Sequence, residues 1–282
     1  MSKKILASAF TIAGNVSPGD PITISPHSLE ERCEATAKAG YVGIGLSIDD
    51  LKFCIEKYGY QAISAILSDA GLEYLEFEVL SDWFASGERR AKSDKDRRIL
   101  IEAAGTLGAY NIKVSPEITN DFWPIEQMTE EFGKMALEFQ KVGAQVALEV
   151  FPEGNVTNLS SGLKIAEGAA VSTGGLLLDI WHMTRGDISY EEITRTSPDY
   201  IKHIELNDAG PSEGSIMDDT LLRRKLPGEG IFDIPKFLKS IAATGYDGLY
   251  GVEILSNIHR QLDPRAQAIA SYNATASQFE KI

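Results

Sequence analysis

Short apolar runs alternate with longer amphipathic stretches along the whole chain. Eight of the runs are typical of buried strands, and they cover residues 5–10, 42–47, 72–79, 112–115, 145–151, 175–180, 200–207 and 249–255. The stretches between them carry apolar residues at helical spacing and predict helices at residues 28–39, 51–70, 92–107, 125–142, 157–171, 189–196, 234–244 and 264–279. The pattern therefore predicts a strand–helix unit that is repeated eight times.

Several predicted helices end at a glycine that is followed at once by the next strand, as at Gly40, Gly71, Gly143 and Gly245. Glycine suits the left-handed conformation in which many helices end. Strict alternation predicts a parallel sheet, and eight units predict closure into an α/β fold, a (β/α)₈ TIM barrel forming one domain over residues 1–282. An open doubly wound sheet is the alternative. It usually has a glycine-rich phosphate loop after its first strand, and residues 14–16 do not match one.

One long segment, residues 208–232, lies between the seventh strand and the seventh helix without predicted structure. Loops of this length in compact domains are usually functional or disordered. In a barrel this segment would lie over the C-terminal face, where barrel active sites are found. We therefore expect it to border the site.

The composition of the chain excludes several classes of partner and site. Hydrophobic residues make up 43% and charged residues 24% of the 282 residues, as in ordinary soluble proteins. The formal net charge of −14 repels phosphate backbones and anionic membranes, so we expect neither nucleic acid nor membrane as a partner. Cys33 and Cys54 alone cannot build a disulfide framework or a thiolate zinc cluster. The N-terminal residues fit a first buried strand better than a signal peptide, and we expect a cytoplasmic protein.

The last four predicted strands each carry a carboxylate near their C-terminal end. Side chains alternate between the two faces of a strand. If Glu149, Asp179, Glu205 and Glu253 point into the barrel, the residues that point outward toward the helices are all apolar. That outward set is Val146, Leu148, Val150, Leu176, Leu178, Ile180, Ile204, Leu206, Val252 and Ile254. A single choice of phase thus accounts for four strands.

Four ionised carboxylates that point at one another would repel, and some would have to take up protons. A bound cation removes this conflict, and ligands that are all oxygen favour Mg²⁺ or Mn²⁺ over Zn²⁺. Glu149, Asp179, Glu205 and Glu253 are therefore predicted to hold one divalent metal. The alternative is that some of these acids form salt bridges or bind a sugar without a metal.

Five segments together resemble the xylose isomerase-like TIM-barrel superfamily, which includes the sugar phosphate isomerase/epimerase family, over essentially the full chain. The segments are VALE (146–149), LLDIWH (177–182), IKHIELND (201–208), LPGEG (226–230) and GYDGLYGVE (245–253). The resemblance implies a metal held by a Glu, an Asp, a His and a Glu, with the two Glu also serving as acid and base. It further implies that a His three positions after the ligand Asp binds substrate, and His182 matches that position.

The chain departs from the family pattern on the seventh strand. The ligand His of the family lies three residues before the strand-end Asp, and Glu205 occupies this position. His203, which is also a candidate for binding substrate, points the same way, one layer deeper. Either Glu205 is a ligand, which gives an all-carboxylate site, or His203 or His182 supplies a nitrogen. We favour Glu205.

Other candidate substrate-binding residues come from loops and from the fourth strand. Trp83, Trp123 and Trp181 all follow predicted strands on the C-terminal side, and we expect an aromatic pocket that holds a sugar ring, with core packing as the alternative. Alternation turns Lys113 inward, where a lysine is costly unless it is paired. Lys113 is expected either to pair with an acid such as Glu78 or Glu149, or to polarise a substrate oxygen. The resemblance implies that Arg224, in the long loop, reaches the substrate, with a solvated surface position as the alternative.

We predict from these features a divalent-metal-dependent sugar isomerase or epimerase. Glu149 and Glu253 would remove and return a proton next to a carbonyl through a metal-stabilised enediolate. The alternative is a lyase that shares this first step, such as a dehydratase of a keto-cyclitol or an eliminase of a 3-keto-glycoside. A sugar-binding protein without metal is a third possibility, and a DNA-repair nuclease of the related barrel family fits poorly because the chain has only four His. We expect a small carbohydrate or keto-sugar as the partner and leave a homo-oligomer open.

Overall fold

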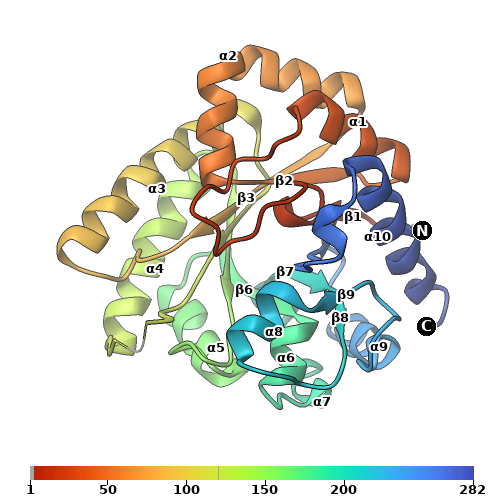
Figure 1. Ribbon diagram of the computed structural model, residues 1–282. Coiled ribbons are helices and arrows are strands. Elements are labelled where there is room, and N and C mark those ends of the chain that lie inside the picture. Colours follow the sequence, from red (N-terminus) through yellow and green to blue (C-terminus); the bar gives the residue numbers. More distant parts are fainter. Residues whose placement is uncertain (1–2, 120) are drawn as a thin grey trace.

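Eight parallel strands close into a barrel in the computed structural model, which describes residues 3–119 and 121–282 (Figure 1). The order of neighbouring strands around the barrel is β1-β10-β7-β6-β5-β4-β3-β2. The barrel strands are β1 (Ile5–Ala7), β2 (Gly43–Ser47), β3 (Tyr74–Leu80), β4 (Asn111–Val114), β5 (Gln145–Glu149), β6 (Gly174–Asp179), β7 (Ile201–Leu206) and β10 (Tyr250–Val252). Because β1 pairs with both β2 and β10, the barrel is closed, which confirms the predicted fold and excludes the doubly wound alternative.

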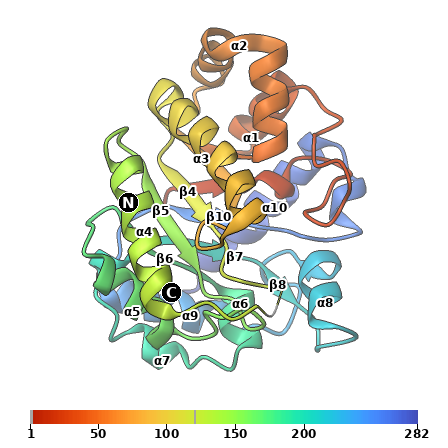
Figure 2. The same ribbon diagram turned by 90° about the vertical axis from the view of Figure 1, so that its left-hand side faces the viewer.

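Helices cover the outside of the barrel in both views (Figures 1 and 2). They are α1 (Leu29–Ala39), α2 (Ile48–Ala70), α3 (Gly87–Leu107), α4 (Ile125–Gln140), α5 (Leu159–Ala169), α6 (Ile180–Arg185), α7 (Tyr190–Ile193), α9 (Ile234–Thr244) and α10 (Pro264–Phe279), whereas α8 (Ile216–Leu222) lies at the barrel mouth. Gly40, Gly71 and Gly245 end α1, α2 and α9 in the left-handed conformation, as their positions in the sequence predict. Within the described part of the chain, none of the helices is long and apolar enough to cross a membrane.

The segment 208–232 has more structure than the sequence pattern indicates. It contains α8 and a two-stranded antiparallel sheet of β8 (Asp208–Ala209) and β9 (Arg224–Lys225). The carboxylate of Asp208 organises the segment, because it accepts hydrogen bonds from the backbone N–H groups of Gly228, Gly230 and Phe232. A side chain at Gly230 would come within 2.1 Å of Asp208. The hydrogen bonds between Asp208 and the LPGEG run therefore hold this segment, which includes Arg224, beside the barrel mouth.

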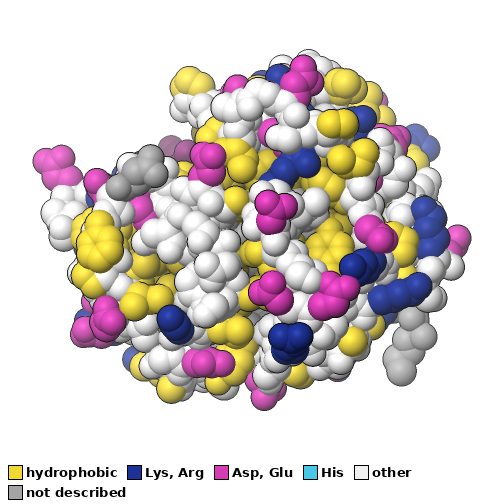
Figure 3. Space-filling model, turned by 90° about the horizontal axis from the view of Figure 1, so that it is seen from below, with side chains coloured by type: hydrophobic (Ala, Val, Ile, Leu, Met, Phe, Trp, Pro, Cys, Tyr) yellow, Lys and Arg dark blue, Asp and Glu magenta, His cyan; other side chains and the backbone are white. Residues whose placement is uncertain are grey.

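The hydrophobic core lies between the strands and the helices, as the predicted outward phase requires. Val146, Leu148, Leu176, Leu178 and Ile204 are all fully buried in this layer. The interior of the barrel near its C-terminal end is polar by contrast, so the site must balance its own charges. On the face seen in Figure 3, acidic side chains are spread out instead of gathered in one patch, which agrees with a solvated acidic surface.

Candidate active site

The four carboxylates predicted as metal ligands all lie inside the barrel near its C-terminal end. Asp179 and Glu205 end or nearly end neighbouring strands and are paired in register, and both are fully buried. Glu253 follows β10 directly and its side chain is 10% exposed, whereas the side chain of Glu149, at the end of β5, is 20% exposed. Glu149 and Glu253 line a central cavity of about 330 Å³, so these two are the carboxylates that a substrate could reach.

The guanidinium of Arg224 lies between two of these carboxylates. Its Nη1 donates to Asp179 Oδ2 at 2.6 Å and to Glu253 Oε2 at 2.8 Å. The other oxygen of Asp179 accepts from the backbone N–H of Trp181 and from the amide of Asn207. Arg224 is therefore buried in the site itself, in contrast to the alternative of a solvated position. It is also one of the residues that line the central cavity.

Lys113 lies on the other side of Glu253 and is 3% exposed. Its ammonium donates to Glu78 and to Glu205, and it lies 3.5 Å from Oε1 of Glu253. Glu205 Oε1 also accepts a hydrogen bond from the Ser8 hydroxyl at 2.9 Å. The structure thus favours the pairing of Lys113 with buried acids, and Glu78 is one of its two nearest partners.

A second polar layer lies below Lys113, deeper in the barrel. The amide of Asn111 donates to Glu76 Oε2 at 2.8 Å, and Nε2 of His203 lies 3.2 Å from the same oxygen. A side chain at Gly251 would come within 2.5 Å of His203 Nε2, so the glycine makes room for the imidazole. His203 is fully buried and does not line the central cavity, and the structure does not place it where a substrate could bind.

The site contains more buried carboxylates than cationic side chains, and this imbalance determines the pKa values of its residues. Burial lowers the pKa of Lys113, but Glu205, Glu76 and Glu78 outweigh this and hold it well above its usual value, so the lysine stays charged. Burial and the neighbouring charge of Glu253 raise the pKa of Glu205 well above its usual range, and burial raises that of Glu78 to about 7. One ammonium cannot neutralise all its neighbours, and the surplus negative charge must be met by protons or by another cation.

Asp179 is in a different state from Glu205. Burial acts to raise its pKa, but the Arg224 guanidinium and His182 together with hydrogen bonds lower it below its usual value. These contacts favour the ionised form of Asp179. Asp179 forms an ion pair with Arg224, which lines the central cavity.

The chemistry of the donor set fits a divalent metal. Ligand atoms of two groups lie within 4.8 Å of one another, and the groups are Glu76, His203 and Glu205, and Glu78, Glu205 and Glu253. Glu205 Oε2 is buried and accepts no hydrogen bond from the described residues. These convergent acids support a divalent metal in the barrel. The predicted set of four is not drawn together as one cluster, because Arg224 and Lys113 stand between its members.

His182 lies where the resemblance predicts a substrate-binding residue. It is in the first turns of α6, it lines the central cavity, and its Nε2 lies 2.7 Å from Glu149 Oε1. The Phe151 ring packs edge-on against its imidazole with the ring centroids 4.8 Å apart. Glu149 and His182 are thus in contact with each other in the lining of the cavity.

The three tryptophans do not line the central cavity, which corrects the expectation of a tryptophan pocket. Trp83 and Trp181 are fully buried in the core. The indole of Trp83 donates to the carbonyl of Ser115, and that of Trp123 donates to Glu117 Oε2 at the rim. The sequence correctly placed all three tryptophans on the C-terminal side of the barrel. Large aromatic rings, however, gain most from packing against other side chains, and here they pack away from the cavity. Other side chains supply the apolar lining, and these are Phe10, Val79, Ile118, Phe151, Met217, Leu221 and Leu255.

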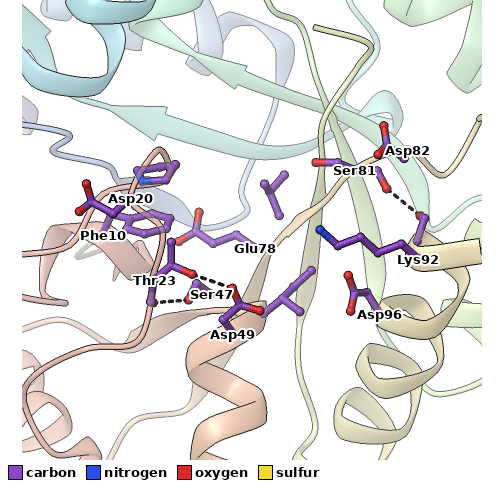
Figure 4. Close-up of a pocket in the computed structure, with 14 residues that line it drawn as sticks. Phe10, Asp20, Thr23, Ser47, Asp49, Glu78, Ser81, Asp82, Lys92 and Asp96 are labelled. Carbon is purple, nitrogen blue, oxygen red and sulfur yellow. Dashed lines mark hydrogen bonds between the residues drawn. The ribbon is translucent and has the colours of Figure 1, made fainter. Parts of the chain in front are cut away.

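A second cavity of about 290 Å³ adjoins the central one (Figure 4). Phe10, Pro18, Glu78, Val79 and Ser81 line both. In Figure 4, Glu78 lies between a group of residues from the first loop and Lys92 on α3. Apart from Ile48, the remaining lining is hydroxyl and acid side chains, namely Asp20, Thr23, Ser47, Asp49, Asp82, Ser93 and Asp96.

The sequence analysis missed the contribution of β3 to the buried acids of the site. Glu76 and Glu78 share one face of β3 and are both buried, yet the prediction considered only Glu78, as a partner of Lys113. The signal was present, because two acids at positions i and i+2 in an otherwise apolar strand must point the same way. With β3 included, the acids inside the barrel come from five strands or strand ends instead of four.

Comparison with known proteins places this geometry in a family. The family model described as xylose isomerase-like TIM barrel matches residues 33–274. The chain belongs to this family. Members of the xylose isomerase-like TIM-barrel family share the fold found here, and the resemblance stated from the sequence is confirmed. The match supports an enzyme of carbohydrate chemistry but leaves the reaction to be argued from the site.

Individual relatives are distant. A 3-dehydroshikimate dehydratase of Pseudomonas aeruginosa is 23% identical over 246 residues, which are 86% of this chain and 38% of the relative. The chain therefore spans well under half the length of that protein. Among solved structures, an IolI protein with a bound zinc atom has a TM-score of 0.83 at 18% identity, covering 99% of this chain and 98% of the other. A D-psicose 3-epimerase of Clostridium cellulolyticum H10 has a TM-score of 0.70 at 14% identity, covering 90% and 93%.

Proposed function

We propose that this protein is a metal-dependent lyase that removes a proton next to a carbonyl of a small polyhydroxylated ketone and then expels a β-hydroxyl or β-alkoxyl group. A keto-cyclitol or a 3-keto-glycoside has the required arrangement of groups. This was the alternative prediction from the sequence, and the asymmetry of the site now favours it over isomerisation. The similarity to a dehydratase supports the same choice.

The single observation that carries the proposal is the unequal environment of Glu149 and Glu253. Glu253 is held by Arg224 and lies 3.5 Å from Lys113, so ion pairs occupy its oxygens. Glu149 faces the cavity, and His182 is the one described residue in ion-pair range of it. A reaction with one base and one proton donor suits this arrangement better than transfer between two equivalent bases.

Each residue has a defined part in this scheme. Glu149 takes the proton from the carbon next to the carbonyl. His182, in contact with Glu149, supplies a proton to the leaving oxygen. Arg224 lines the cavity and faces the negative charge that develops on the carbonyl oxygen, as Lys113 does from below. The carbon–hydrogen and carbon–oxygen bonds break, a carbon–carbon double bond forms between the two carbons, and water or an alcohol is released, so that the product is an unsaturated ketone.

A divalent metal, with Mn²⁺ or Mg²⁺ preferred, would be held by the four carboxylates predicted from the sequence, Glu149, Asp179, Glu205 and Glu253. Glu205 Oε2 accepts no hydrogen bond from the described residues, whereas Asp179 and Glu253 would exchange their ion pairs with Arg224 for the metal. When bound, the metal would polarise the carbonyl and its neighbouring hydroxyl, which makes the hydrogen between them more acidic. The surplus of buried carboxylates supports this part of the proposal.

The charge of the cavity restricts the substrate. Lys113 and Arg224 are the only cations among its described lining residues, and both are already paired with acids. A phosphate or a free carboxylate would therefore meet unbalanced negative charge. A neutral polyol ketone fits, with its hydroxyl groups on the polar floor and its ring face against Phe10 and Phe151.

Solvent-exchange kinetics test the proposal. Metal-loaded protein is incubated in ²H₂O with a panel of keto-cyclitols and 3-keto-glycosides, and products are followed by NMR. We expect loss of water or alcohol together with deuterium incorporation at the carbon next to the carbonyl. Deuterium incorporation with inversion or carbonyl migration, and without elimination, would assign the protein to the epimerases or isomerases that the D-psicose 3-epimerase similarity supports.

A further inference from the structure

Three apolar side chains in the lining of the central cavity are open to solvent, and together they form what we call the apolar rim. Val79, Ile118 and Met217 all line the cavity, and they are 37%, 48% and 36% exposed. They come from β3, from the loop after β4 and from α8, which are far apart in the sequence. Exposed apolar side chains that converge on one cavity from three separate segments indicate a surface that a ligand covers.

The loop that carries Ile118 is held in place by the neighbouring residue Glu117, which is buried. One oxygen of the Glu117 carboxylate accepts hydrogen bonds from the indole of Trp123 at 2.7 Å and from the guanidinium of Arg89 at 2.8 Å. The other oxygen accepts from the backbone N–H of Thr119 at 2.6 Å. These bonds hold the backbone on both sides of Ile118. A surface that is fixed before its ligand arrives binds that ligand at a smaller cost in conformational entropy.

The charged part of the lining is chemically different from the apolar rim. It includes Lys113, Glu149, His182, Arg224 and Glu253, and each of these is in ion-pair range of another. The hydroxyl groups of a sugar suit this part, because they can donate to carboxylates and accept from cationic side chains. The side chains of the apolar rim can do neither. One cavity therefore offers a polar surface for a sugar and an apolar surface for a group attached to it.

Phe151 brings apolar surface directly to the position of the leaving oxygen. Its ring lines the cavity and packs against the imidazole of His182, with the ring centroids 4.8 Å apart. In the proposed function His182 gives its proton to the leaving oxygen, so the group on that oxygen lies near Phe151. A leaving hydroxyl has no further atoms that could cover this ring or the apolar rim, whereas an apolar alkoxyl group could bury both.

We propose that the substrate is a 3-keto-glycoside with an apolar group on its anomeric oxygen, and that Val79, Ile118 and Met217 bind this group. The inference rests on the proposed function for its reaction and selects the glycoside over the keto-cyclitol. The carbon between the carbonyl and the anomeric carbon loses its proton to Glu149, and the electron pair of that bond forms the double bond to the anomeric carbon. The bond from the anomeric carbon to oxygen breaks with its electrons on the oxygen, which takes the proton of His182 and leaves as an apolar alcohol.

Benzyl and methyl 3-keto-β-glucoside test this inference, because they differ only in the group on the anomeric oxygen. Benzyl alcohol and methanol have similar acidity, so a preference between the two substrates reports binding of the group and not the ease of its departure. We expect metal-loaded, full-chain protein to show a kcat/KM at least about tenfold higher for the benzyl compound, through a lower KM, because the ring buries apolar surface. Equal kcat/KM values would overturn the inference.

Ile118→Ser and Met217→Ser each remove apolar surface from the rim. Both side chains are exposed, so neither change opens a cavity in the core. We expect each variant to lower the benzyl-to-methyl ratio of kcat/KM by at least about threefold. Ile269→Ser is the matched control, because Ile269 on α10 is 41% exposed and does not line the central cavity, and it should keep the wild-type ratio. An unchanged ratio in both rim variants would overturn the inference.

Binding of benzyl and methyl β-glucoside separates this inference from the proposed function. Neither compound has a carbonyl, so neither can undergo the elimination, and titration calorimetry measures binding alone. We expect the benzyl compound to bind at least about tenfold more tightly, and Ile118→Ser to reduce this difference. If the difference is found but the 3-keto-glucosides are not cleaved, the proposed function fails and the apolar rim keeps its assigned role. Equal affinities, or no binding of either glucoside, would overturn the role of the rim even if both 3-keto-glucosides are cleaved.

Discussion

Replacement of Glu149 by glutamine is the most direct probe of the chemistry. Glutamine keeps the length of the side chain and one oxygen that can face His182, which lies 2.7 Å from the carboxylate. An amide, however, cannot accept the proton that a general base removes. The change therefore removes the base while leaving the shape of the cavity intact.

The expected size of the effect follows from the position of Glu149. General-base catalysis by a positioned group contributes about 10²–10⁴-fold, which equals about 3–5 kcal/mol of activation free energy at 1.36 kcal/mol for each factor of ten. Glu149 lines the cavity and is the most exposed of the four carboxylates predicted from the sequence, and its one ion-pair partner among the described residues is His182. We expect Glu149→Gln to slow proton exchange by at least about 10²-fold.

Glu253→Gln is the matched comparison. Arg224 retains Asp179, and Lys113 retains Glu78 and Glu205, so the cations in the site remain paired. We expect this variant to bind metal less tightly, but to exchange the substrate proton within about tenfold of the wild type once saturated with metal. Both variants are measured at saturating Mn²⁺ by NMR detection of deuterium exchange into the substrate. The assignment is refuted if metal-saturated Glu149→Gln exchanges at the wild-type rate, and equal losses in both variants would restore a two-base mechanism.

Three further changes test other parts of the structure. His182→Ala should keep stoichiometric Mn²⁺ by metal analysis while losing most activity, and loss of the metal would instead make His182 a ligand. Trp83→Ala should lower the free energy of unfolding in urea by about 3–5 kcal/mol because the indole is fully buried, and a change below 1 kcal/mol would contradict this packing. Burial lowers the pKa of His259, so the protein should lose stability as the pH falls below the ordinary histidine value of about 6.5. His259→Gln should make this decline shallower by up to about 1.4 kcal/mol per pH unit, and an unchanged slope in pH-dependent urea unfolding would exclude His259 as its source.

The sequence alone determined the barrel and the direction of its carboxylates. Alternating apolar and polar positions are a local property, because side chains of a strand point to opposite faces whatever the strand pairs with. Glu149, Asp179, Glu205 and Glu253 were therefore placed inside correctly. The eight strand–helix units likewise required no knowledge of tertiary contacts, and the observed strand order confirms their closure.

Only the tertiary structure decided how the charges are shared. Lys113 and Glu253 are 140 positions apart, and Arg224 and Asp179 are 45 apart, so no local pattern links them. The same alternation that turns four acids inward also turns Lys113 inward, but it cannot say which acids the ammonium meets. The partners of Lys113 depend on strand register. Those of Arg224 depend on the hydrogen bonds to Asp208 that hold the segment containing Arg224.

The tryptophans also show what the sequence could not predict, in this case how their side chains pack. Position in the chain places Trp83 and Trp181 after strand ends, and this is correct. Whether a large ring then faces the cavity or the core depends on the space left by residues that are distant in sequence. Trp83, for example, packs against Phe132 on α4, with the ring centroids 5.7 Å apart. Burial of large apolar rings is favoured wherever the assembled fold provides room, and only the assembled fold defines that room.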